Sequence, residues 1–192
     1  MADEKTNQST RSQEESNQKD QEKKPNKHQI SDLNQLINTI NWLYNFQVSE
    51  KYKGYELGYF VTPRRLLHSV KKMDRAGYFL EDISCIDLQE GLQVVYHFDH
   101  YDSPGRIVVR TVVPRDNPSL PSICDVYPGA AWHERECHDF FGVRFEGHPN
   151  PGPLLLDPEF EGPPPLLKEE SARKTMDQIH PERGFPPGMS MG

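Results

Sequence analysis

Hydrophobic residues between positions 31 and 77 recur at the spacing of two helices. The first predicted helix starts at Ser31, and its apolar stripe consists of Leu33, Leu36, Ile37, Ile40, Leu43 and Tyr44. The second begins after Thr62-Pro63, a capping residue followed by a proline suited to the first helical turn, and is expected to stop at Gly77. Its core side consists of Leu66, Leu67, Val70 and Met73.

Strand-like runs follow each of these helices. They cover residues 55–61, 78–88, 92–99 and 106–113. Turn sequences at 90–91 and 103–105 separate the last three, which are therefore expected to form a consecutive antiparallel meander. Helices packed on such a sheet predict a two-layer α/β sandwich, an α+β arrangement with a mainly antiparallel sheet.

The chain changes character after Val113, because most of its prolines lie beyond this residue. A helix-like stretch from Ser122 to Phe141 is expected to be broken at Tyr127-Pro128-Gly129 and to end at Gly142, a favourable left-handed cap. This signature helix is followed by an extended, proline-rich C-terminal tail over residues 150–192.

One face of the signature helix mixes aromatic and charged residues, since Trp132, Glu136 and Phe140 recur every four positions. The same spacing stacks Glu134 on His138 and Arg135 on Asp139. A carboxylate between two aromatic rings is costly to desolvate alone. Glu136 is therefore expected to meet a cation from Arg135, from elsewhere in the chain or from another protein, which indicates an interface or a site.

The two ends of the chain differ in composition. Residues 1–28 have no Val, Ile, Leu or aromatic residue and carry six acids against six bases, so residues 1–29 are predicted to be a disordered polar arm. Residues 30–149 form the predicted domain. In the tail, Leu154-Leu155-Leu156 and Leu166-Leu167 are apolar clusters among prolines, and they are expected to be buried on a partner protein.

Charge and motifs exclude several function classes. The net charge of −7 argues against non-specific nucleic-acid binding, no apolar run is long enough to span a bilayer, and no signal peptide is recognised, so a soluble cytoplasmic chain is expected. Nucleotide-binding glycine loops and the GxSxG nucleophile motif are missing. The chain alone therefore looks non-catalytic.

A zinc site is the sharpest enzymatic alternative. His133 and Cys137 have the spacing of the paired ligands in an HExxH helix, with Glu134 at the position of the general base. Cysteine replaces the second histidine of that motif, and no third ligand is dictated by spacing. With Cys85 and Cys124 far apart from Cys137, neither a disulfide framework nor an iron–sulfur ligand set is expected.

The segment from Ser122 to Lys168 closely resembles the C subunit of respiratory complex I, also called the 30-kilodalton subunit. The resemblance rests on an ERE-x-x-D-x-x-G run followed by GHP and a leucine cluster. The residues that carry it are Trp132, Glu134, Arg135, Glu136, Asp139, Phe141, Gly142, Phe145, Gly147, His148, Pro149, Leu154 and Leu156. The helix and strand order upstream is compatible with the α/β fold of that family.

This resemblance implies a non-catalytic subunit of the peripheral arm, on the cytoplasmic side of the membrane, with only indirect membrane contact. No cofactor is implied on this chain, since the iron–sulfur clusters and flavin belong to other subunits. The implied partners are a hydrogenase-like D subunit and an iron–sulfur B subunit. Glu134, Arg135, Glu136 and Asp139 would then form or orient interface ion pairs, and the tail would wrap along the partner.

One departure from the family pattern lies directly after the GHP residues and bears on which neighbouring subunit this chain meets. After GHP the respiratory pattern has a leucine and two arginines, whereas this chain has Pro151-Gly152-Pro153, which removes bidentate partners for carboxylates. Related complexes, including deazaflavin-dependent dehydrogenases and energy-converting hydrogenases, use a similar subunit. The donor (NADH, reduced deazaflavin or ferredoxin) and the acceptor (quinone or methanophenazine) stay open, and a free-standing adaptor protein is the alternative from another class.

Overall fold

The structure is a computed structural model, and it describes residues 44–47, 55, 57–102 and 105–180. The predicted polar arm, the predicted first helix up to residue 43 and residues 181–192 of the tail lie outside the described residues. Tyr44, which the helical spacing assigned to the first helix, is instead the first residue of strand β1. No helix of the described part has the length and apolar character needed to cross a membrane.

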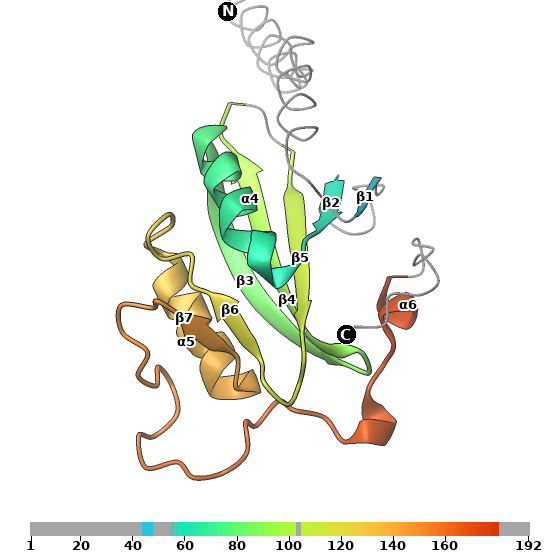
Figure 1. Ribbon diagram of the computed structural model, residues 1–192, viewed down its shortest axis with the longest axis vertical. Helices are drawn as coiled ribbons and strands as arrows, with labels where there is room; N and C mark the ends of the chain where they lie inside the picture. Colours follow the sequence, from blue (N-terminus) through green and yellow to red (C-terminus); the bar gives the residue numbers. More distant parts are fainter. Residues whose placement is uncertain (1–43, 48–54, 56, 103–104, 181–192) are drawn as a thin grey trace, which may run out of the picture.

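A five-stranded sheet forms the centre of the domain (Figure 1). Its strands are β1 (Tyr44–Gln47), β2 (Leu57–Phe60), β3 (Tyr78–Leu88), β4 (Gly91–His100) and β5 (Ile107–Val113). They lie in the order β1-β2-β5-β4-β3. The antiparallel pairs β3–β4 and β4–β5 confirm the predicted meander, whereas the parallel pairing of β2 with β5 was not predicted.

Helix α4 (Pro63–Arg75) confirms the second predicted helix. Thr62 precedes it in an extended conformation and a proline stands in its first turn, while Leu66, Val70 and Met73 are buried beneath it. Gly77 follows with a φ of +84°, and a Cβ there would lie 2.8 Å from His100 Nε2. Both the left-handed backbone and the close histidine therefore favour glycine at this stop.

Helix α5 (Ala130–Phe141) is the predicted signature helix, and it packs against β3 on the same core as α4. It ends at Gly142, whose φ is +75° and whose N–H donates to the carbonyl of His138 at 2.8 Å. The extension of helical structure back to Ser122 was wrong, because residues 122–129 form turns and extended chain. Pro128 disfavours a continuous helix through this stretch, because it lacks the N–H that a helix interior requires.

Two short strands flank α5 in the sequence. They are β6 (Ser119–Pro121) and β7 (Arg144–Glu146), which pair in parallel as a separate two-stranded sheet. Leu120 of β6 and Val143 beside β7 are fully buried in the main core. The segment that contains α5 is therefore tied to the domain at both ends, which confirms an α+β fold with a mainly antiparallel sheet.

The tail runs from the end of β7 around one end of the large sheet to its other face (Figure 1). It contains the 3-10 helix η1 (Glu170–Ala172) and the short helix α6 (Met176–Ile179). Leu167 packs against the main core, and Met176 is buried in a second cluster with Phe60, Leu88 and Val112. Leu167, Met176 and Ile179 therefore pack on their own domain, whereas Leu155 and Leu166 are exposed, so burial of the leucine clusters on a partner stays a prediction.

Candidate functional site

The candidate site is the outer part of α5 with the loops that its polar side chains hold. Glu134 is fully buried beneath the helix, although the helical spacing singled out Glu136 as the costly carboxylate. Its Oε1 accepts the Ile123 N–H at 2.7 Å, and its Oε2 accepts the Ser122 hydroxyl at 2.6 Å and the Cys124 thiol at 3.3 Å. Glu134 therefore fixes the turn that leads into the helix.

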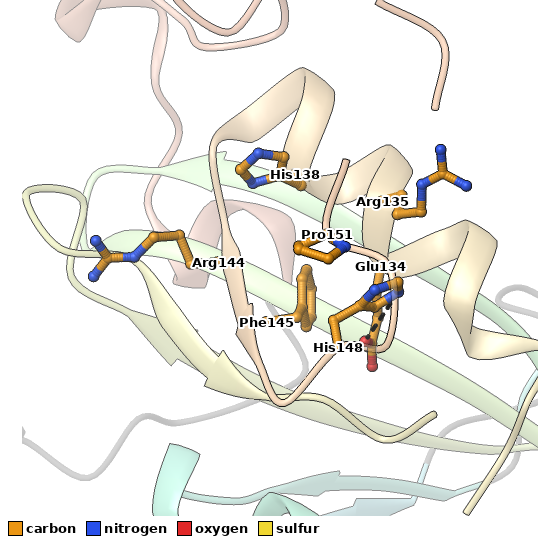
Figure 2. Close-up of a pocket in the computed structure, with 7 residues that line it drawn as sticks. All are labelled: Glu134, Arg135, His138, Arg144, Phe145, His148 and Pro151. Atoms are coloured by element: carbon orange, nitrogen blue, oxygen red, sulfur yellow. Dashed lines mark ion pairs between the residues drawn. The ribbon is translucent and has the colours of Figure 1, made fainter. Parts of the chain in front are cut away.

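The surroundings of Glu134 affect its protonation. Burial raises the pKa of the Glu134 carboxyl, and the hydrogen bonds from Ile123, Ser122 and Cys124 only partly offset this effect. The predicted stacking of Glu134 on His138 is not formed, because His138 Nδ1 lies 3.1 Å from the carbonyl of Val143. Instead His148 lies on the other side of Glu134, with Nε2 at 3.9 Å from Oε2 (Figure 2).

Cys124, Glu134 and His148 place potential metal-ligand atoms within 4.8 Å of one another. Their hydrogen bonds do not favour a metal, however. His148 Nδ1 accepts the Asn150 N–H at 3.0 Å, which places the ring proton on Nε2, 3.1 Å from the carbonyl of Ala131. Burial raises the pKa of the Cys124 thiol to about 11, so the sulfur keeps its proton. The cluster is therefore a closed hydrogen-bond network.

The predicted zinc pair is also not assembled. His133 Nδ1 lies 3.3 Å from an Asp82 carboxylate oxygen, while Cys137 is buried with its sulfur 3.9 Å from the carbonyl of Ile83. Burial raises the pKa of Cys137, which disfavours the thiolate that zinc requires. In the part of the chain that the structure describes, neither side chain belongs to a group of three possible ligands. The described geometry therefore does not support this alternative.

Arg135 and Asp139 do not pair with each other as the helical spacing predicted. Arg135 Nε donates to the Gly152 carbonyl at 2.8 Å, and its Nη2 donates to the Pro153 carbonyl. Asp139 Oδ2 accepts three backbone N–H groups, from Leu154 at 2.9 Å, Leu155 at 2.7 Å and Leu156 at 3.1 Å. Both side chains therefore hold the loop at 152–156 along α5.

The pKa of Asp139 lies below its ordinary value of 3.8. Burial alone would raise this pKa, but the backbone hydrogen bonds from residues 154–156 favour the carboxylate more strongly. The loop is thus attached to an ionised Asp139 at neutral pH.

Replacing Asp139 with Ala is expected to release this loop. Three N–H donors lose their acceptor, so the free energy of unfolding should fall by about 1–3 kcal/mol. Denaturant titration and amide hydrogen exchange at residues 154–156 measure the two effects. Asp157→Ala is the matched control, since Asp157 is exposed and, among the described residues, its carboxylate accepts a single N–H, from Glu159. Unchanged exchange at 154–156 in Asp139→Ala would contradict the attachment.

The outer face of α5 has no comparable partners among the described residues. Trp132 is 70% exposed, and Glu136 is exposed without a hydrogen bond or ion pair to any described residue. Of the three predicted sources of a cation for Glu136, Arg135 is instead bound to the loop carbonyls, and a cation from another protein stays a prediction. Leu155, Phe160 and Leu166 are also exposed, at 64%, 46% and 51%. We call Trp132, Glu136, Leu155, Phe160 and Leu166 the outer surface.

The remaining residues of the predicted signature have structural positions. Phe141 and Phe145 pack partly buried against the core, Gly142 and Gly147 have positive φ values, Pro149 is exposed, and Leu154 and Leu156 are half-buried. A cavity of about 210 Å³ lies between α5, β7 and the loop that follows β7 (Figure 2). Its lining consists of Glu134, Arg135, His138, Arg144, Phe145, His148 and Pro151. Hydrogen bonds already engage both arginines, Arg144 with Asn117.

Asp87 is a central residue that sequence reasoning missed. It is fully buried at the end of β3, where one carboxylate oxygen binds Arg115 and the other accepts the Lys168 N–H at 2.8 Å and Arg173 Nε at 3.3 Å. Burial alone would raise its pKa, but the Arg115 and Lys168 hydrogen bonds hold it below 3.8. The sequence contains no distinct signal for it, because Asp87 is one of three acids in β3, together with Glu81 and Asp82.

Sequence comparison with known proteins identifies the family of this chain. Residues 60–176 match the family described as respiratory-chain NADH dehydrogenase, 30 Kd subunit. The C subunit of NADH-quinone oxidoreductase from Roseiflexus sp. (strain RS-1) is 32% identical over 150 residues, which span 71% of this chain and 86% of that protein. The chain belongs to this family. The resemblance carried by the signature segment is thereby confirmed.

Other similar proteins are named as subunits of different oxidoreductase complexes. The C subunit of F(420)H(2) dehydrogenase from Methanosarcina mazei is 37% identical over 81 residues, covering 42% of this chain and 51% of that protein. The C/D subunit of NADH-quinone oxidoreductase from Methylococcus capsulatus is 36% identical over 114 residues, covering 54% of this chain and 19% of that longer protein. The family thus includes subunits of more than one kind of oxidoreductase complex.

A solved structure supports the fold. The trypsin-resistant fragment of Nqo5 superposes with a TM-score of 0.54 and 25% identity, covering 64% of this chain and 98% of the fragment. The 30 Kd subunit fold is therefore present, and this chain extends beyond the share that the fragment covers.

Proposed function

We propose that this chain is a non-catalytic peripheral-arm subunit of a complex I-type, ion-translocating oxidoreductase. It docks on a D-like subunit through the outer surface. Relatives named as C/D subunits support this pairing, since they carry C-like and D-like parts in one polypeptide. A D-like partner is therefore close to the C-like domain in these fused proteins.

The non-catalytic part of the proposal rests on how the polar residues are used. Glu134, Arg135, Asp139 and His148 each make hydrogen bonds to turns and loops of this chain. These hydrogen bonds already use polar atoms of the four side chains, which supports a structural role for them in this chain. These four residues shape the surface that a partner meets. On the outer surface, Glu136 has no partner among the described residues and can pair with a cation of the partner protein.

The observation that carries the docking proposal is the exposed Trp132 on the same helix as Glu136. Exposed tryptophans are frequent energetic centres of interfaces, because one ring buries a large apolar area with few rotatable bonds. Arg135 and Asp139 place the loop with exposed Leu155 along this helix. The outer surface thus combines apolar side chains with an acid that has no partner among the described residues, a composition suited to a protein partner.

The wider assembly follows from the same proposal. An iron–sulfur B-like subunit is the second neighbour, the complex faces the cytoplasm, and the iron–sulfur clusters and flavin are held by other subunits. NADH, reduced deazaflavin and ferredoxin are the candidate donors, and the relative from F(420)H(2) dehydrogenase keeps the deazaflavin donor among them. Quinone and methanophenazine are the candidate acceptors.

The deciding experiment is purification of the tagged full chain from its native membranes, followed by mass spectrometry and by metal and flavin analysis. Co-elution of D-like and B-like subunits, with no metal or flavin on the chain after it is separated from them, is the expected result. The input subunits recovered alongside identify the donor. A chain that elutes with an unrelated soluble protein and without a D-like subunit would instead favour the adaptor alternative.

Replacing Trp132 with Ala is expected to weaken binding to the D-like subunit by about 2 kcal/mol, roughly 30-fold. The free energy of unfolding of the isolated chain should change by less than about 0.5 kcal/mol, because the side chain is exposed. Tyr101→Ala is the matched control, since Tyr101 is 81% exposed but lies just after β4. Equal binding by the Trp132 variant and the wild type would exclude this face from the interface.

A further inference from the structure

The outer edge of β3 offers backbone hydrogen-bonding groups. β3 is the last strand of the sheet, and within the described ranges β4 is the one strand that pairs with it. The two-residue turn at 89–90 makes Leu88 and Gly91 a hydrogen-bonded pair, and such pairs alternate along an antiparallel ladder. The register is regular from Asp82 to Leu88. The N–H and C=O groups of Ile83 and Cys85 therefore point away from β4.

The C-terminal tail already pairs with this edge at the last residue of β3. Lys174 forms a parallel bridge with Leu88, and its carbonyl accepts the Gln89 N–H at 3.0 Å. An extended segment therefore lies against the edge of β3 in this structure, but only at one residue pair. Further back along the strand, no described segment continues the backbone pairing at Ile83 and Cys85, and the Cys137 thiol lies 3.9 Å from the Ile83 carbonyl as a weak donor.

A groove of about 300 Å³ runs beside this open stretch, between β3 and α5. Phe140 and Leu166 supply apolar surface, and Cys85 is a partly buried part of its lining. Asp82 and Glu136 supply two acids to the same groove. Asp82 faces His133 at 3.3 Å and His97 at 3.6 Å, whereas Glu136 has no partner in the described part of the chain. The groove therefore combines apolar surface with two acids.

We propose that this groove takes an extended segment of the partner protein, which pairs with the edge of β3 at Ile83 and Cys85. An apolar side chain of that segment packs on Phe140 and Leu166, and a neighbouring Lys or Arg reaches Glu136 and Asp82. This is recognition by strand addition. In this mode, main-chain hydrogen bonds to the strand edge provide affinity, and pockets for the side chains of the added segment provide specificity. The inference rests on the proposed function, because the partner meant is the D-like subunit.

Charge argues against a second copy of this chain as the occupant. Antiparallel pairing of two β3 edges would bring two sets of Asp82 and Glu136 into one interface. Like charges facing each other across a strand pair are destabilising. The net charge of −7 adds to this repulsion. A basic segment of a different protein is the complementary occupant.

The test compares amide hydrogen exchange in the free chain and in the complex purified from native membranes. Exchange of the Ile83 and Cys85 amides is expected to slow at least tenfold on assembly. A double variant, Asp82→Lys with Glu136→Lys, is expected to reduce recovery of the D-like subunit at least tenfold. Asp74→Lys is the matched control, since Asp74 is an exposed acid near the end of α4.

The outcomes separate this inference from the proposed function. If the D-like subunit is recovered while the two amides exchange at the free-chain rate, strand addition is overturned and the proposed function stands. If the wild-type chain never brings down a D-like subunit, the proposed function itself fails. Concentration-dependent dimerisation that the double variant abolishes would assign the groove to a second copy and overturn the inference. Thermal unfolding of the double variant checks that a loss of binding is not a loss of folding.

Discussion

Replacing Glu134 with Ala is expected to lower the free energy of unfolding by about 3–5 kcal/mol, which is a large part of the stability of a domain this size. The Ile123 N–H and the Ser122 hydroxyl would lose their acceptor inside the protein, and the removed side chain would leave a cavity. Because Glu134 also fixes the entry to α5, the outer surface should become disordered together with this turn.

The matched variant is Glu134→Gln, which keeps one carbonyl oxygen for Ile123 and nearly the same volume. Its cost should be only about 1–2 kcal/mol. Urea titration of the isolated chain, monitored by tryptophan fluorescence and by circular dichroism, measures both variants. Equal stability of Glu134→Ala and the wild type would show that the carboxylate does not support the turn.

The raised pKa of Glu134 adds a pH dependence to this result. A carboxyl whose folded pKa lies above its unfolded value of 4.5 binds the proton more tightly in the folded state. Its contribution is fully present below pH 4.5 and is lost as pH rises through the folded pKa. Glu134→Gln has no titrating carboxyl at this position and should lack this loss of stability. The difference in the free energy of unfolding between the wild type and Glu134→Gln should therefore change as the pH rises from 4.5 through the folded pKa of Glu134.

Replacing Asp87 with Ala is expected to cost about 3–5 kcal/mol and to free the tail. Arg115 and Arg173 would lose a buried carboxylate, and the Lys168 N–H would lose its acceptor. Denaturant titration measures the stability, and limited proteolysis within residues 165–180 measures the release. Asp116→Ala is the matched control, because Asp116 is exposed and adjacent to the same arginine. A tail that stays protected in Asp87→Ala would contradict this role.

The pH dependence of Asp87 has the opposite sign to that of Glu134. Its folded pKa lies below the unfolded value of 3.8, so the unfolded state binds the proton more tightly. The contribution is present above pH 3.8 and is lost as pH falls through the folded pKa. Release of the tail should therefore precede global unfolding during acid titration, and Asp87→Ala should abolish that early step.

The sequence was most informative where structure depends on neighbouring residues. Strand β3 has the predicted bounds, and α4 and α5 end near the predicted glycines. Hydrophobic periodicity, capping and turn residues act over a few positions, so they can be recognised in one chain. The family could be recognised for the same reason, because its signature is a continuous run of residues around α5.

The sequence identified the residues of the candidate site but not which of them are buried and which are exposed. Helical spacing places Glu134 and Glu136 on different faces but does not say which face meets the core. The sequence suggested that Glu136 bears the desolvation cost, whereas the structure buries Glu134 and exposes Glu136. The choice depends on the turn at 122–124, because its hydrogen-bond donors lie outside the helix and helical periodicity does not describe them.

By itself, the sequence determined helix α4, the meander, the signature helix and the family. Only the tertiary structure decided the parallel pairing of β2 with β5, the burial of Glu134 and the path of the tail around the sheet. Asp87 illustrates the physical reason, since it meets Arg115, Lys168 and Arg173, which lie 28, 81 and 86 residues away. Such contacts depend on which distant segments are brought together, and local patterns contain no information about that choice.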